Sequence, residues 1–255
     1  MKYFILTTIA LSAGLFSNAQ TKQKPVASNI NPHIRVYNQA MNGGDFTTAT
    51  VALNYFLTER GFENDYTDTL AILYMQQGAY PQCYYWASKR LETKKDDNLL
   101  LEMKGICLDK LQQPKEAIDI FEKLFAKTQS PYHAYKLMEL QYGIKRLSEC
   151  LSTAIAAEKL TFKPDYLMTY SFGQQTGRTY LQAGVYNIHG LALYDLDKKA
   201  EAKEYFRKAL SLDSSFALAK QNLEAIISIE AGIDPSKRAL NGVSSQNASP
   251  ANKEN

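Results

Sequence analysis

The sequence is poor in cysteine and histidine, with three of each among its 255 residues. Cys83, Cys107 and Cys150 are too few to build a disulfide scaffold, and their odd number leaves at least one thiol unpaired. We interpret them as buried free thiols that pack like small apolar residues. A bridge between Cys83 and Cys107 stays open, because the sequence does not place the two sulfur atoms.

Motifs that carry catalysis are missing as well. The sequence contains no phosphate-binding GxxxxGK[ST] loop, no HExxH, no paired CxxC and no GxSxG elbow. His133 and Cys150 are the nearest His–Cys pair, and both fall on segments that we expect to be packing helices. The neighbouring carboxylates Asp65 and Asp68 are more typical of a solvated helix face than of a metal or acid–base pair. We therefore expect no enzyme activity, no catalytic residue, no metal site and no cofactor.

The charge is nearly balanced, with 29 Lys and Arg residues against 26 Asp and Glu residues and a formal net charge of +3. Nucleic-acid-binding domains usually have a strong excess of positive charge, because contacts with phosphates supply much of the affinity. The sequence therefore argues against a nucleic-acid partner.

One long apolar run is present, at the start of the chain. It extends over 13 mostly apolar residues from Phe4 to Phe16 and is followed by Ser17-Asn18-Ala19. Such a run is shorter than the roughly 18 to 20 residues of a membrane-spanning helix and is typical of a cleavable signal peptide. We predict a signal peptide over residues 1–19, with an uncleaved membrane anchor as the alternative. The protein would then be exported, periplasmic or extracellular and associated with the cell envelope, without an integral membrane segment after cleavage.

The clearest pattern lies in residues 184–216, where two segments have apolar or small residues at three- and four-residue spacing. They are Tyr186, Gly190 and Leu193, followed by Ala202, Phe206 and Ala209. This spacing gives each of two helices one apolar stripe, and the polar residues 197–199 form a turn between them. Gly190 and Ala202 are small residues in the two stripes, and they predict that the helices cross closely at these points.

This pattern resembles the tetratricopeptide repeat (TPR), a 34-residue helix-turn-helix unit. The six residues match the family's aromatic, glycine and large residue on the first helix and its Ala, aromatic and Ala on the second. The departures are His189, where the family prefers leucine, and Ser214, where it prefers proline. The resemblance implies an all-α superhelical solenoid.

The same period extends through most of the chain. Repeats are expected to start near residues 30, 64, 98, 132 and 183, which gives about five helix-turn-helix repeats in a solenoid over 30–235. The fourth repeat is degenerate, and a shift of its second helix by one residue would bring Cys150, Ala154 and Ala157 inward. A flexible lead-in (20–29), a capping helix (216–231) and a disordered tail (236–255) complete the expected organisation.

The period is interrupted by 17 additional residues over 166–182. Tyr166, Met168, Tyr170 and Phe172 alternate with the residues between them, and a GQQTG sequence follows. Alternation and aromatic content predict a β-hairpin with a loop of about five residues. Two roles stay open for this insertion, because it either fills the gap between repeats or takes part in binding.

In the TPR family the first helix of each repeat lines a concave groove that holds a protein segment. Carried onto this chain, the groove positions are Asn38, Met41, Ile72, Met75, Gln76, Ile106, Asp109, Lys110, Lys136, Leu140, Ile144, Asn187, Leu191 and Tyr194. These residues are largely apolar. Asn38 matches one position of the family's carboxylate clamp, but Ile34 stands where the clamp has lysine, which argues against a clamp. The alternative is that several of these residues are buried, for example under the lead-in.

A second surface is predicted at Tyr84, Tyr85 and Trp86, on the second helix of the second repeat. Three consecutive aromatic residues cannot all face the same side of a helix, so we expect Tyr85 to point outward on the convex side. The patch either packs against the next helix or anchors a partner protein.

We therefore expect a non-catalytic scaffold or adaptor of the cell envelope that binds another protein or peptide in an apolar concave groove. The alternative is a structural subunit that self-assembles or supports an envelope complex without a free peptide ligand. Homo-oligomerisation stays open.

Overall fold

The computed structural model describes residues 30–232, which form helices and one two-stranded sheet. The elements are α1 (Pro32–Asn42), α2 (Phe46–Arg60), α3 (Asp65–Gln76), α4 (Tyr80–Leu91), α5 (Asn98–Lys110), α6 (Pro114–Thr128), α7 (Pro131–Gly143), α8 (Leu147–Ala157), β1 (Leu167–Phe172), β2 (Gln175–Tyr180), α9 (Leu181–Asp195), α10 (Lys199–Leu212) and α11 (Ala217–Glu230). The predicted signal peptide, the lead-in and the tail lie outside the described residues.

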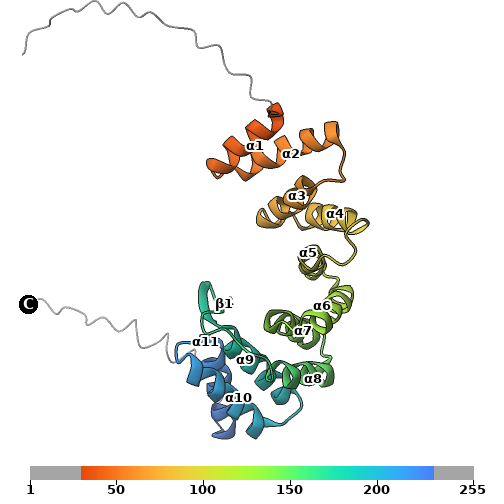
Figure 1. Cartoon of the computed structure of the whole chain (residues 1–255). Helices are drawn as coiled ribbons and strands as arrows, with labels where there is room; N and C mark the ends of the chain where they lie inside the picture. The colour runs from red at the N-terminus through yellow and green to blue at the C-terminus, as the bar shows by residue number, and fades with distance from the viewer. Residues whose placement is uncertain (1–29, 233–255) are drawn as a thin grey trace, which may run out of the picture.

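The helices follow an arc in which successive pairs stack on one another (Figure 1). In this view α3, α5 and α7 lie on the inner side of the arc, and α4, α6 and α8 lie on the outer side. The hairpin projects into the inner side near α11. The predicted all-α solenoid with an inserted hairpin and a terminal capping helix is confirmed.

The turn inside each helix pair repeats one backbone feature. Gly44, Gly78, Gln112, Lys145 and Asp197 have φ angles between 59° and 71°, in the left-handed region. The first three are spaced by 34 residues, whereas Lys145 comes one residue early. The second helix of the fourth pair therefore starts early, and Cys150, Ala154 and Ala157 on α8 are fully buried, which confirms the predicted shift.

Close helix crossings depend on two glycines. A Cβ atom on Gly190 would lie 2.7 Å from the Phe206 ring, and one on Gly105 would lie 2.8 Å from the Phe121 ring. The small residue Ala202 was expected at this crossing, but the Phe206 ring is what lies against Gly190. Each glycine leaves room for an aromatic ring of the next helix, which explains why the motif combines these two residue types.

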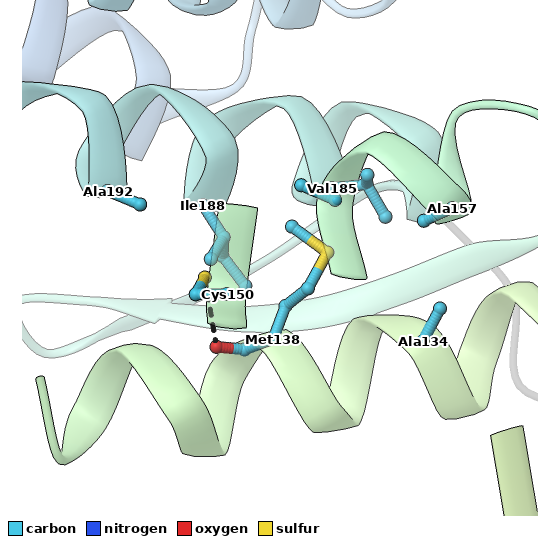
Figure 2. Close-up of a cluster of buried hydrophobic side chains, with 8 residues drawn as sticks. Ala134, Met138, Cys150, Ala157, Val185, Ile188 and Ala192 are labelled. Atoms are coloured by element: carbon cyan, nitrogen blue, oxygen red, sulfur yellow. Dashed lines mark hydrogen bonds between the residues drawn. The ribbon is translucent and has the colours of Figure 1, made fainter. Parts of the chain in front are cut away.

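The insertion does not interrupt the core. Ala134 and Met138 of α7 pack with Cys150 of α8 and with Val185 and Ile188 of α9 (Figure 2). The Cys150 thiol donates to the Met138 carbonyl oxygen at 3.5 Å, and burial raises the pKa of this thiol to about 12. All three cysteines are buried free thiols, so the Cys83–Cys107 bridge is not formed.

The hairpin is tighter than predicted. β1 and β2 pair antiparallel with Phe172 opposite Gln175, which leaves a turn of only Gly173 and Gln174. Gly173 has a φ of 59°, which suits such a turn, so the expected five-residue loop is wrong. Gly177 stays inside β2 because the ring of Tyr170 lies over it, 2.5 Å from the place of a Cβ atom.

Candidate binding surfaces

The inner helices carry the predicted groove residues. Three of them, Asn38, Gln76 and Lys110, are exposed. Nine more are half-buried, so each presents part of its side chain: Met41, Ile72, Met75, Ile106, Asp109, Lys136, Ile144, Leu191 and Tyr194. These twelve residues lie on, or directly after, α1, α3, α5, α7 and α9, and seven of them are apolar or aromatic.

Leu140 and Asn187 correct the predicted groove. Leu140 is only 4% exposed, because it packs into a cluster with Leu108 and Ile118 of the preceding pair. Asn187 is 5% exposed, and its side-chain oxygen accepts a hydrogen bond from Asn222 of α11 at 2.9 Å. The capping helix therefore covers this position.

The hairpin is anchored to α9 and to the start of α11. The Met168 side chain lies over Gly184 of α9, where an added Cβ atom would clash with its sulfur. The Tyr170 ring packs edge-on against Phe216 with 4.8 Å between the centroids, and its hydroxyl accepts from the Ala217 N–H group at 3.2 Å. These contacts hold β1 in a fixed position on the inner side of the arc.

A cavity of about 310 Å³ lies between the hairpin and α7. Its wall comprises Tyr132, Tyr135, Lys136, Glu139, Tyr166, Leu167, Met168, Thr169 and Leu181. Burial raises the pKa of both Tyr132 and Tyr135, and the Glu139 carboxylate adds to the effect, so both phenols stay neutral. Tyr166 stacks on Tyr132 with 6.5 Å between the ring centroids.

Sequence reasoning missed this tyrosine-lined cavity. The family positions name Lys136 on α7 but not Tyr132 or Tyr135, since a regular repeat has no hairpin beside it. Two further cavities of about 420 and 430 Å³ adjoin the base of the hairpin, and Lys163 and Tyr166 contribute to both. The tyrosines concentrated in 132–180 are the sequence signal that could have identified this region.

The convex patch is partly as predicted. Tyr85 is 57% exposed and points outward, which confirms the expectation. Trp86 is half-buried, and its ring lies 5.0 Å from both the Phe62 and the Tyr85 rings. Tyr84 packs toward the next helix pair, with the Lys104 amine 5.4 Å from its ring centroid. Only Phe62, Tyr85 and part of Trp86 form an aromatic surface here.

Asp65 and Asp68 are not simply a solvated face. Arg90 is almost buried and donates from Nε to Asp68 at 2.6 Å and from Nη2 to Asp65 at 3.0 Å. Lys94 bonds both carboxylates and lowers the pKa of Asp65. This ion cluster ties the start of α3 to the end of α4, so its role is structural.

His189 fills the leucine position of the fifth repeat. It is buried, stacks on Tyr205 with 3.7 Å between the ring centroids, and shares a 2.6 Å hydrogen bond through Nδ1 with Glu158. Burial lowers the pKa of His189, although the Glu158 carboxylate opposes this shift. The histidine is therefore a packing residue held by one polar partner.

The N-terminal helix pair is uncovered in the described part of the chain. Val36 of α1 and Val51 and Tyr55 of α2 are 45%, 50% and 61% exposed. At the other end, Ile226 of α11 is buried with Leu193 and Phe206. Ile227 and Ile229 of the same helix are nevertheless 46% and 45% exposed, so both ends of the solenoid present apolar side chains.

The comparisons with known proteins agree with this geometry. A model of the tetratricopeptide repeat matches residues 183–216, the stretch that carries the strongest pattern. The chain is a TPR solenoid. Among curated proteins, none matches its sequence.

Solved structures support the fold over most of the chain. The crystal structure of a MamA protein matches with a TM-score of 0.59 and 18% identity, covering 72% of this chain and 92% of that one. MamA from Desulfovibrio magneticus RS-1 gives 0.59 and 17%, covering 72% and 95%. YrrB, described as a TPR protein with an unusual peptide-binding site, gives 0.59 and 17%, covering 74% and 89%. At these identities the likeness shows the fold alone.

No helix between residues 30 and 232 combines the length and the apolar character needed to cross a membrane.

Proposed function

We propose that this TPR solenoid is a scaffold that holds a segment of another protein against its inner surface. The observation that carries the proposal is the strip of half-buried Met, Ile, Leu and Tyr side chains on successive inner helices. Apolar residues that are partly exposed on several adjacent repeats offer a continuous surface for a partner segment. YrrB, which shares the fold, is described as having a peptide-binding site, which supports a similar use here.

We also propose that the protein acts in the cell envelope after export. The support is the apolar run and the small residues that follow it in residues 1–19. Mass spectrometry of protein from the native host is expected to find a mature N-terminus at Gln20. Soluble cytoplasmic protein that retains Met1 would contradict export.

A double substitution tests the groove. Met75 and Ile106 lie on α3 and α5, and both are half-buried. Met75→Asp with Ile106→Asp should weaken a groove-bound partner by about a hundredfold, since each buried apolar contact contributes about 1 to 2 kcal/mol. Tyr85→Ala on the convex side is the control and should leave that partner unaffected. A partner recovered from envelope extract is titrated against all three proteins, each first shown to be folded by circular dichroism.

A structural subunit is the second candidate, and the uncovered N-terminal pair favours it. Exposed Val51 and Tyr55 on one helix suit an end-to-end contact between subunits. If this candidate is correct, Val51→Lys with Tyr55→Lys should dissociate an oligomer seen by light scattering. The groove variants should then leave the assembly intact.

A further inference from the structure

The hairpin leaves the outer edge of β1 without a backbone partner. The N–H group of Leu181 donates to the carbonyl oxygen of Tyr166 at 2.8 Å, which makes these two a hydrogen-bonded pair. Bonded and non-bonded pairs alternate along an antiparallel ladder. The backbone groups of Leu167, Thr169 and Ser171 therefore point away from β2, and within residues 30–232 no backbone or side-chain group bonds them.

Nothing in the composition of β1 protects this edge. Its six residues, LMTYSF, include no charged residue and no proline. Natural proteins usually place lysine, proline or a bulge on an open edge to prevent pairing with another chain. On β2 the outward-pointing backbone groups include those of Arg178, so that edge does carry a charge. The unprotected edge of β1 is thus the one that favours a third strand, and a two-stranded sheet gains stability from one.

The space beside this edge fits an extended segment. The cavity between β1 and α7 is bounded by Leu167 and Thr169 on one side and by Tyr132 and Tyr135 on the other. Its volume of about 310 Å³ leaves room for a large side chain. The charges in its wall cancel, because Lys136 and Glu139 form an ion pair with each other. Electrostatic complementarity therefore requires an uncharged side chain at this point of a partner.

We propose that β1 accepts an extended segment of a partner protein as a third strand. The segment bonds to the outward backbone groups of Leu167, Thr169 and Ser171 and places an apolar or aromatic side chain in the cavity against Tyr132 and Tyr135. Backbone bonds give the affinity and the cavity gives the side-chain preference. This proposal rests on the scaffold function and specifies the conformation and chemistry of its partner.

The test uses random peptides displayed on phage, selected on the full chain, and synthetic copies of the enriched peptides. Thr169→Pro removes an outward N–H group without removing a bond to β2, so it should weaken binding by at least about tenfold. Thr176→Pro is the matched control, because it makes the same change at an outward position of β2 and should change binding by less than about twofold. Only every second N–H group of a bound peptide strand points toward β1. N-methylation of that set of residues should abolish binding, and N-methylation of the other set should preserve it.

Hydrogen exchange keeps the test independent of the proline variants. In the parent protein, a bound peptide should slow exchange at the amides of Leu167, Thr169 and Ser171. Exchange there that does not change on binding would overturn the proposal, even if Thr169→Pro failed to fold.

The other outcomes separate this proposal from the scaffold function. Peptides that tolerate Thr169→Pro but are lost with Met75→Asp and Ile106→Asp would overturn strand addition and preserve the scaffold. A dimer of the protein that Thr169→Pro dissociates would assign the edge to a second copy, which also overturns it. A selection that enriches no peptide would overturn both.

Discussion

The solenoid begins with the helix pair α1 and α2 and ends with a single capping helix, α11. Val51 and Tyr55 of α2 are exposed at the N-terminal end, and at the C-terminal end α11 buries Ile226 against the fifth repeat but leaves Ile227 and Ile229 exposed. The C-terminal half also contains the hairpin, with its cavity and its open strand edge. The 34-residue repeat thus determines how the helix pairs stack. The elements outside the repeat, such as the hairpin, determine which surfaces are left for partners.

The largest effect is expected from removing the hairpin. Leu181 N–H and the Tyr166 carbonyl oxygen are 2.8 Å apart, so two glycines can replace residues 167–180 without moving the helices. The loss of burial of Met168 and Tyr170 should lower the free energy of unfolding by about 2 to 4 kcal/mol. Chemical denaturation should still show one cooperative transition of a helical protein.

That outcome would show that the hairpin rests on a solenoid that is complete without it. If the helical signal is lost altogether, the hairpin is instead part of the core. The distinction between the helical repeats and the inserted hairpin would then be wrong.

Overpacking at a helix crossing should rank second. Gly190→Leu forces a side chain into the Phe206 ring and should destabilise the fold by about 1 to 3 kcal/mol, measured by thermal melting. Gly143 on α7 is the control, because nothing lies within 4 Å of its Cβ position. Gly143→Ala should leave the melting temperature unchanged or raise it slightly. Equal melting temperatures for the parent and Gly190→Leu would refute the close crossing.

In the N-terminal half, the ion cluster around Arg90 should contribute less to the free energy of unfolding. Arg90→Ala leaves Asp68 with Lys94 as its remaining partner and should lower the free energy of unfolding by about 1 to 2 kcal/mol. The matched control is Lys89→Ala on the same helix, whose amine pairs with the exposed Glu92. If the two variants unfold alike in urea, the cluster is not a structural tie.

The smallest effect concerns pH in the fifth repeat. Burial holds the pKa of His189 below its usual value, so the unfolded chain binds a proton more readily than the folded one. Stability is therefore lost as pH falls through the usual histidine pKa. Between about pH 7.5 and about pH 5.5, His189→Leu should reduce that loss by up to about 1 kcal/mol. An identical pH dependence in the parent and the variant would show that His189 does not contribute to it.

The sequence predicted the fold well because the spacing of small and apolar residues within each repeat specifies its two helices. The contact between Gly190 and Phe206 recurs between Gly105 and Phe121. The one-residue shift of α8 was predicted from Cys150, a small apolar residue that is buried one position early. Local spacing encodes such helices, so a single chain is enough to find them.

The site was harder to predict because it is made by residues far apart in the sequence. Tyr132 and Tyr166 stack across 34 residues, and a family rule for regular repeats contains no hairpin beside α7. Burial of Asn187 depends on Asn222 of the capping helix, which the same rule also omits. The turn length was wrong because the sequence does not show that Gly177 lies under the Tyr170 ring.

The central claim is that partners bind on the inner side of the arc, along the inner helices and β1. The most direct measurement is amide hydrogen exchange of the full chain, free and with a bound partner segment. The account predicts slower exchange in α3, α5 and β1, and no change in α4. Protection confined to the helix that carries Tyr85 and Trp86 would contradict it and move the binding surface to the convex side.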